Sequence, residues 1–125
     1  MRVAIIGQGY VGLTISIGAL SAGHEVVGID HSEAVVDSLN SGKSHIEGIT
    51  NQDLLAGISS GKFIATNSYE SARDADVVVI AVPTPLDGSG KPDLSLLKSA
   101  GESLASVLTK STLVKRVHFT SGYFA

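Results

Sequence analysis

The sequence predicts an α/β fold in which a doubly wound parallel sheet of about five strands, in the order 3-2-1-4-5, carries helices on both faces. Three observations lead to this prediction. Short continuous apolar runs alternate with segments of helical periodicity, as in sheets buried on both sides. The first run ends in the glycine-rich segment 7–12, Gly-Gln-Gly-Tyr-Val-Gly. The second run ends at an acidic residue, Asp30, which lies 18 residues after Gly12.

The first strand, helix and second strand follow directly from this pattern. The apolar run 3–6 stops at a glycine, which is typical of a buried strand that leads into a turn. Residues 11–22 carry apolar side chains at helical spacing, and Gly23 stands where a helix C-cap is expected. The apolar run 26–29 predicts the second strand.

The middle of the chain is predicted to hold two more helices and a weak strand. Ser32 is a suitable N-cap for a helix that reaches about Asn40. Thr50 or Asn51 can open the next helix, because both side chains accept hydrogen bonds from backbone N–H groups. The short apolar segment 63–65 predicts the third strand.

The last third repeats the alternation of helix and strand. A short helix is expected over 68–73, and the run 77–82, Val-Val-Val-Ile-Ala-Val, is the strongest buried strand. After a loop rich in Pro and Gly, Asp93 is expected to cap a helix through about residue 108, with Leu94, Leu97, Leu104 and Leu108 on one face. Residues 113–117 are expected to form the fifth strand.

The glycine segment has the context of a Rossmann-like dinucleotide site, with a strand before it and a helix after it. Gly7 permits a tight turn, Gly9 lets a pyrophosphate approach the backbone, and Gly12 allows close packing of helix on strand. The helix N-terminus then offers N–H groups to the phosphates, and Asp30 is placed to bind the ribose hydroxyls. A carboxylate there favours NAD over NADP. The alternative is an ordinary glycine turn followed by a strand-end aspartate.

Composition bounds the function classes. At 125 residues the chain is expected to be one domain, since domains run to roughly 100–200 residues. A net charge of −3 argues against a nucleic-acid partner. The absence of cysteine excludes a disulfide scaffold, a cysteine zinc site and a cysteine nucleophile within the chain. No metal site is expected. We find no signal peptide and no apolar stretch near the ~18 residues of a membrane span, so a cytoplasmic location is expected.

Two further motifs carry a resemblance to a known family. Val-Pro-Thr-Pro-Leu at 82–86 is followed by Lys-Pro-Asp-Leu-Ser at 91–95, and Leu-Asn-Ser-Gly-Lys-Ser stands at 39–44. Together with the glycine segment, these motifs resemble the UDP-glucose/GDP-mannose dehydrogenase family from residue 1 to about residue 114. The resemblance implies the NAD-binding N-terminal domain of an enzyme that oxidises C6 of a nucleotide sugar from alcohol to carboxylate with two NAD.

The resemblance also implies roles for individual residues. Thr84 matches the family threonine that contacts NAD, and Pro83 stiffens the loop that carries it. Tyr10 and Val11 are expected to lie against the dinucleotide. For Tyr10 the alternative is a partly buried aromatic with a packing role.

The sequence also indicates a subgroup of the family and departs from the family pattern in places. The short segment 44–49, Ser-His-Ile-Glu-Gly-Ile, is similar to members that act on UDP-N-acetylhexosamines, whereas UDP-glucose members have a longer loop. Val35 replaces a lysine that supports the adenosine ribose. Residues 115–125 do not follow the family, and the adjacent cations Lys115 and Arg116 are costly in a buried strand. We therefore expect a truncated domain whose tail is frameshifted or otherwise altered.

The family's nucleophile is a cysteine that captures the C6 aldehyde, and this chain has none. The 125 residues alone are therefore expected to be inactive, and the nucleotide-sugar substrate is expected only for the longer enzyme. Two alternatives are a stand-alone dinucleotide-binding module with a regulatory or structural role, and a Rossmann dehydrogenase of the β-hydroxyacid type. An exposed sheet edge leaves a homo-oligomer open as a further expectation.

Overall fold

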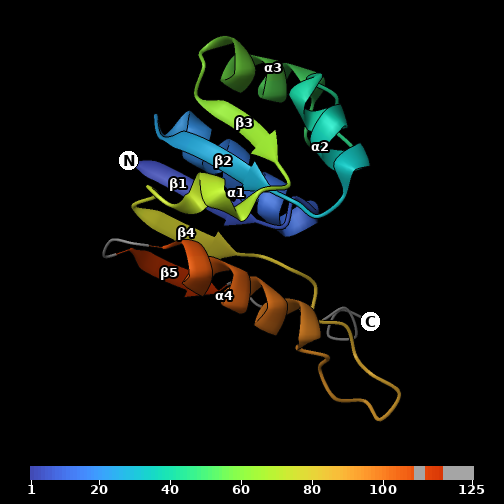
Figure 1. Ribbon diagram of the computed structural model, residues 1–125. Helices are drawn as coiled ribbons and strands as arrows, with labels where there is room; N and C mark the ends of the chain where they lie inside the picture. The colour runs from blue at the N-terminus through green and yellow to red at the C-terminus, as the bar shows by residue number, and fades with distance from the viewer. Residues whose placement is uncertain (109–111, 117–125) are drawn as a thin grey trace.

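The computed structural model describes residues 1–108 and 112–116, which form a five-stranded parallel sheet (Figure 1). The strands lie in the order β3-β2-β1-β4-β5, so the predicted fold class and strand order are confirmed. Their bounds are β1 (Arg2–Ile6), β2 (Glu25–Ile29), β3 (Phe63–Thr66), β4 (Val77–Ile80) and β5 (Leu113–Arg116).

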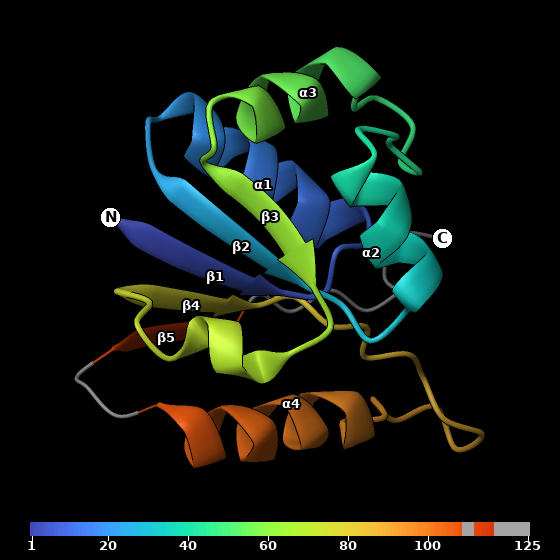
Figure 2. The same cartoon turned by 45° about the horizontal axis from the view of Figure 1, so that its top comes forward.

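Helices cover both faces of the sheet (Figure 2). On one face lie α1 (Tyr10–Ser21), α2 (Glu33–Asn40) and α3 (Asn51–Ser59), whose apolar side chains form a core with β1, β2 and β3. On the other face lie the 3₁₀ helix η1 (Tyr69–Ala72) and α4 (Ser95–Val107). Each face of the sheet therefore has its own apolar core, which explains why β1, β2 and β4 read as continuous apolar runs.

Helix capping follows the sequence closely on the first face. The Ser32 hydroxyl accepts a hydrogen bond from the Val35 N–H at 3.3 Å and opens α2 as predicted. Thr50 opens α3 through a capping box with Asp53, in which each side chain accepts from the other residue's backbone N–H. Gly23 lies just after the end of α1 with a φ of +91°, a conformation that suits glycine.

The start of α4 differs from the prediction. The helix begins at Ser95 with Leu94 as its N-cap, and Asp93 is not the N-cap. The Asp93 N–H donates to the Pro85 carbonyl at 2.7 Å, which holds Asp93 in the preceding loop. Its carboxylate still accepts from the Ser95 N–H at 2.9 Å. Leu94 is 47% exposed, whereas Leu104, which was expected on the same face, is 3% exposed, so Leu94 does not share the buried side of the helix.

One strand end and one helix also differ in detail. The expected strand 77–82 ends at Ile80, although the Ala81 N–H still donates to the Ile6 carbonyl at 2.8 Å. The short helix expected over 68–73 is the 3₁₀ helix η1. Ser68 is its N-cap, and the Ser68 hydroxyl accepts a hydrogen bond from the Glu70 N–H. Val117, the expected end of the last strand, lies outside the described residues.

Lys115 is not buried in the last strand, so the expected free-energy cost of burying its charge is absent at this residue. In the described sheet β5 pairs with β4 and is the edge strand, and Lys115 and Val114 are exposed. The ammonium group of Lys115 therefore stays in water. Of the tail predicted to be altered, 117–125 lie outside the described residues.

The opposite edge of the sheet is covered by a side chain. Asn40, the last residue of α2, donates from Nδ2 to the Ala65 carbonyl at 2.8 Å and accepts at Oδ1 from the Ala65 N–H at 2.9 Å. These two bonds satisfy backbone groups of β3 that face away from β2. The amide of Asn40 thus takes the place that a further strand would otherwise occupy.

Candidate cofactor site

A cavity of about 580 Å³ lies where β1, β2 and β4 end, between the start of α1 and the start of α4. This is the edge of the sheet where the strand order reverses, which is where open α/β sheets bind ligands. The predicted site residues that line the cavity are Gly7, Gly9, Tyr10, Val11, Asp30, Pro83 and Thr84. Gly12, the remaining predicted residue, does not line it.

Gly7 and Gly12 shape the turn between β1 and α1. Gly7 has a φ of +91°, and a Cβ there would lie 2.7 Å from the Ala81 carbonyl oxygen. A Cβ at Gly12 would overlap the Gly7 carbonyl group itself. Both glycines therefore allow α1 to start directly against the end of β1, as their positions in the motif predict.

Gly9 has different surroundings from the other two glycines of the motif. Outside its chain neighbours, no heavy atom of the described residues lies within 4 Å of the position a Cβ would take. Gly9 is also the N-cap of α1, whose first internal hydrogen bond runs from the Leu13 N–H to the Gly9 carbonyl. The N–H groups of the first turn thus have no partner within the helix and suit an anionic phosphate.

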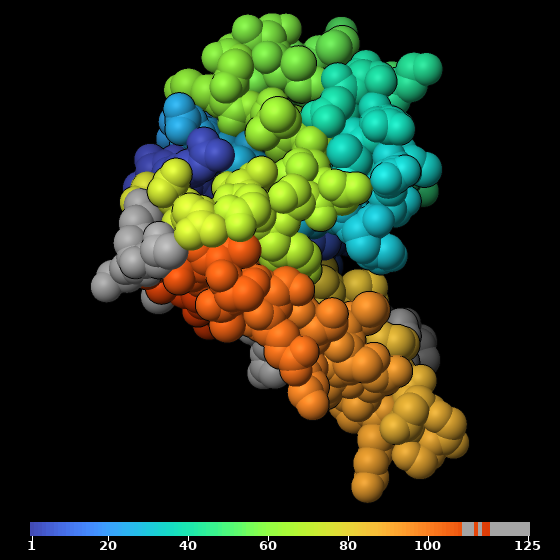
Figure 3. All heavy atoms as spheres, in the orientation of Figure 1, coloured from blue at the N-terminus to red at the C-terminus, as the bar shows by residue number. Residues whose placement is uncertain are grey.

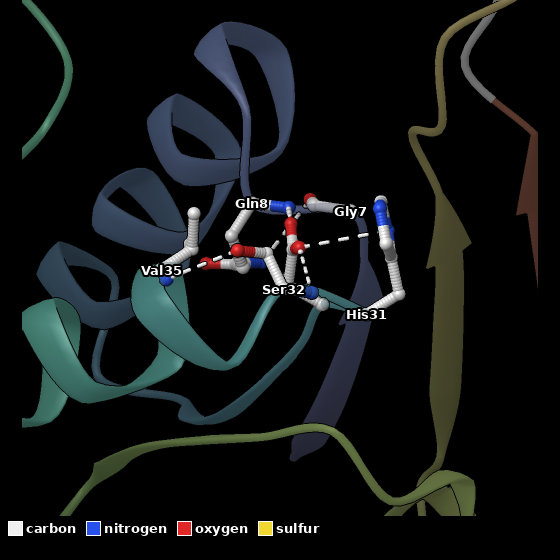
Figure 4. A network of polar contacts seen from close by, with 6 residues as sticks. Gly7, Gln8, His31, Ser32 and Val35 are labelled. Carbon is white, nitrogen blue, oxygen red and sulfur yellow. Dashed lines mark hydrogen bonds and ion pairs between the residues drawn. The ribbon is translucent and has the colours of Figure 1, made fainter.

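Asp30 contributes a carboxylate to the lining of the cavity, and Figure 4 shows Gln8, Ser32 and His31, which surround this carboxylate. Its Oδ2 accepts from the Gln8 N–H at 2.9 Å, and its Oδ1 accepts from the Ser32 N–H at 2.9 Å. The side chain is 12% exposed, and the exposed ring of His31 lies 3.7 Å from Oδ1. A carboxylate held this way retains lone pairs that can accept from a pair of ribose hydroxyls.

The loop after β4 forms the facing wall of the cavity. Thr84 is 3% exposed and, like Pro83 and Pro85, lines the cavity. The rest of the wall comes from α4, where Leu96 and Ala100 are apolar and Ser99 carries a hydroxyl. A mainly apolar wall with a few hydroxyl groups, in the same cavity as a carboxylate, suits a ligand that carries both a flat ring and a sugar.

Beyond this wall the chain forms a loop that projects from the body of the molecule (Figure 3). An isolated antiparallel bridge joins Leu86 to Pro92 at its base. The Asp87 carboxylate accepts from the Ser89 hydroxyl at 2.7 Å and from the N–H groups of Ser89 and Lys91. These bonds, the Ser89 hydroxyl first among them, lower the pKa of Asp87. The loop is therefore ordered by its own polar contacts.

Two residues with a place at this site were missed by the sequence prediction. Gln8 is fully buried beneath the glycine turn. Tyr69 on η1 lines the cavity, and burial, followed by the negative charge of Asp30, raises the pKa of its phenol. Tyr69 therefore stays neutral near pH 7. The position of Gln8 between two glycines could have indicated its role in the turn, but no local sequence pattern indicates that Tyr69 lines the cavity.

Val35, which replaces the lysine expected for the family, does not line the cavity. Its side chain packs against the core between the sheet and α1, α2 and α3. Within residues 1–108 and 112–116, no helix has the length and apolar character needed to cross a membrane. In the same residues no group of His, Asp and Glu side chains is placed to hold a metal ion.

Comparison with known proteins places the chain in a family. The model of the UDP-glucose/GDP-mannose dehydrogenase family, NAD binding domain, matches residues 1–117. UDP-glucose 6-dehydrogenase AglM of Haloferax volcanii is 38% identical over 126 residues, covering 93% of this chain and 29% of that protein. GDP-mannose 6-dehydrogenase of Pseudomonas syringae pv. syringae is 41% identical over 123 residues, covering 93% and 28%.

The solved structure of a UDP-D-ManNAc dehydrogenase from Pyrococcus horikoshii superposes with a TM-score of 0.87 at 38% identity, covering 93% of this chain and 28% of that one. The chain thus spans less than a third of the length of these relatives. The match extends through all of the described residues, including β5, and it excludes the alternative of a β-hydroxyacid dehydrogenase. The chain belongs to the UDP-glucose/GDP-mannose dehydrogenase family, it corresponds to the NAD binding domain of that family, and its cofactor is NAD.

Proposed function

We propose that this chain supplies the NAD site of a nucleotide-sugar 6-dehydrogenase, and that NAD occupies the cavity at the ends of β1, β2 and β4. The observation that carries the proposal is the pairing, across one cavity, of the open surface at Gly9 with the fixed carboxylate of Asp30. The first suits a pyrophosphate, and the second suits the two hydroxyls of an unphosphorylated ribose.

Each predicted residue has a role in this proposal. The N–H groups at the start of α1 bind the pyrophosphate above Gly9, while Gly7 and Gly12 keep the turn tight enough to present them. Tyr10 and Val11 lie at the cavity wall against the dinucleotide, and Pro83 and Thr84 close the opposite wall. Bound NAD supplies a hydride acceptor, and these residues bind it, orient it and keep water from its apolar parts.

The sugar substrate is proposed to be a UDP-N-acetylhexosamine. The proposal rests on the short segment 44–49 between α2 and α3. The relatives named for UDP-glucose, UDP-N-acetyl-D-mannosamine and GDP-mannose are similarly identical to this chain, at 38%, 39% and 41%, so overall identity favours none of the three. The choice of subgroup therefore rests on the resemblance of that short loop.

Calorimetric titration of the chain with NAD and NADP tests the cofactor site. We expect NAD to bind and NADP to bind at least tenfold more weakly, because Asp30 repels a 2′-phosphate. Asp30→Ala is expected to weaken NAD binding by about tenfold or more, since hydrogen bonds to a charged group contribute about 1.5–3 kcal/mol. Asp37→Ala removes an equal charge from the exposed surface of α2 and is expected to leave both affinities unchanged. No binding of NAD at millimolar concentration would refute the proposal.

A further inference from the structure

We infer that Gln8 is a positioning residue that fixes the Asp30 carboxylate and thereby sets the preference for NAD over NADP. This inference rests on the proposed cofactor site and assigns a specific task to a residue that does not line the cavity. It depends on three observations: the hydrogen bonds of the Gln8 side chain, the space that Gly28 in β2 leaves for that side chain, and the hydrogen bond from the Gln8 backbone N–H to the Asp30 carboxylate.

The side-chain amide of Gln8 ties the glycine turn to two other elements. Gln8 is 0% exposed, and its Nε2 donates to the Ile5 carbonyl at 3.1 Å and to the Gly7 carbonyl at 3.2 Å. Its Oε1 accepts from the Ser16 hydroxyl at 3.1 Å, and Ser16 is fully buried in α1. One side chain thus links the end of β1, the turn and the second turn of α1.

The space for this amide exists because β2 has a glycine at the facing position. Gly28 pairs in register with Ile5, and a Cβ at Gly28 would lie 2.7 Å from both Cδ and Oε1 of Gln8. Any other residue at position 28 would therefore push the amide out of its place. Gln8 and Gly28 form one unit, in which the absence of a side chain in β2 accommodates the long side chain of the turn.

The backbone N–H of Gln8 connects this hydrogen-bonded turn to Asp30 in the cofactor site. The N–H of Gln8 donates to Oδ2 of Asp30, while the N–H of Ser32 donates to Oδ1 (Figure 4). The two N–H groups come from different elements and hold the carboxylate in one rotation. If the turn at Gln8 shifts, Oδ2 loses its donor and the carboxylate can rotate about the bond to Ser32.

The rotation of Asp30 matters for selectivity as well as for affinity. A fixed carboxylate accepts from both ribose hydroxyls of NAD and opposes the 2′-phosphate of NADP. A carboxylate that is free to rotate accepts hydrogen bonds less well from the ribose hydroxyls of NAD. It can also turn away from the 2′-phosphate of NADP and so repel it less. Loss of the Gln8 amide therefore reduces the ratio of the two dissociation constants. A variant that only lowers stability leaves this ratio unchanged.

The experiment measures NAD and NADP dissociation constants for Gln8→Met and Gly28→Ala. Gln8→Met keeps the length of the side chain but removes its hydrogen bonds, and Gly28→Ala displaces the intact amide. Both are expected to weaken NAD binding about tenfold, the equivalent of one buried charge-assisted contact, and to reduce the preference for NAD several-fold. Should either variant fail to fold, Ser16→Ala removes one bond at the far end of the amide, and a smaller change in the same direction is expected.

Two controls separate positioning from loss of stability. Leu54→Ala removes a fully buried side chain of α3, and it is expected to lower the melting temperature without changing the ratio of NADP to NAD dissociation constants. In an Asp30→Ala background, Gln8→Met is expected to change NAD affinity by less than about threefold, because the group it positions is gone.

The outcomes distinguish this inference from the proposed function. If the unaltered chain binds no NAD, the proposed site itself is wrong. If the unaltered chain binds NAD and the folded Gln8→Met and Gly28→Ala variants keep its affinity and selectivity, the role of Gln8 is refuted. Equal effects of Gln8→Met in the presence and absence of Asp30 would also refute it, because the amide would then act by another route.

Discussion

Gly9 and Gly12 lie within one turn at the start of α1, yet a methyl group added to each would meet different surroundings. At Gly12 it would overlap the Gly7 carbonyl, whereas at Gly9 it would reach into open space at the cavity. Gly12 is thus required by the protein's own packing. Gly9 is required by the ligand, if the phosphates of NAD bind where we propose.

This contrast gives a paired prediction for Gly9→Ala and Gly12→Ala. Gly12→Ala is expected to destabilise the fold by about 1–3 kcal/mol or more, as overpacked sites do, which denaturant unfolding measures. Gly9→Ala is expected to keep the stability of the unaltered chain but to weaken NAD binding about tenfold or more in a calorimetric titration. A Gly9→Ala variant that binds NAD normally would contradict the proposed position of the pyrophosphate.

At the residue scale, the sequence was sufficient for side chains whose task is set by a local pattern. The roles of Gly7 and Gly12 in the turn follow from the spacing of the motif, and the described backbone fits them. The role of Gln8 could not be predicted, because its partners Ser16 and Gly28 come from α1 and β2. A contact between three elements is defined only once the sheet register is known.

Among the elements, β3 has part of its outer edge covered by one side chain of α2. The amide of Asn40 bonds to both backbone groups of Ala65, and Asn40 stands in the segment 39–44 that resembles the family. Unpaired backbone groups on an edge strand are a template for pairing with another chain. The two hydrogen bonds to Ala65 give Asn40 a structural role that does not involve the cofactor.

Removal of this contact is expected to destabilise the domain without affecting the cofactor. Asn40→Ala breaks two hydrogen bonds and is expected to lower the free energy of unfolding by about 1–3 kcal/mol, measured by denaturant titration. Asn67→Ala removes an exposed amide just after β3 and is expected to change it by less than about 0.5 kcal/mol. Equal stabilities for the two variants would show that the edge does not need this amide.

The order of the helices and strands was predictable because each strand is buried on both faces and each helix has an apolar side. The ends of elements were less predictable. Asp93 was expected to open α4, but the bond from its N–H to the Pro85 carbonyl keeps it in the loop, and the helix starts two residues later. That bond belongs to the loop closed by Leu86 and Pro92, which no helical pattern encodes.

For the whole molecule, the cofactor site and the covalent chemistry of the family are separable. The cavity at the ends of β1, β2 and β4 is where we propose that NAD binds, whereas the 125 residues contain no cysteine to serve as nucleophile. The location of the site was predictable, because the switch point between β1 and β4 follows from the strand order. The residues that α4 and η1 contribute to the cavity were not predictable, since they depend on how these two helices pack against each other and against the sheet.

The separation predicts that the chain binds NAD but does not reduce it. With UDP-sugars and NAD, we expect no steady formation of NADH, measured by the absorbance of the reduced cofactor. The chain spans less than a third of its relatives' length, and it has no thiolate to carry the aldehyde into the second oxidation. A calorimetric titration of the same preparation establishes that NAD is bound. Steady production of NADH by the purified chain would show that the covalent step does not require the cysteine.

The strand order also has a consequence for how the chain assembles during synthesis. β1 is made first, yet it lies in the middle of the sheet and pairs with β4, with Val3 opposite Val77. At a synthesis rate of 5–20 residues per second, the roughly 70 intervening residues take about 4–14 seconds to make. During that time one edge of an apolar strand has no partner, so the interval before β4 emerges is when the nascent chain is most open to pairing with the wrong strand.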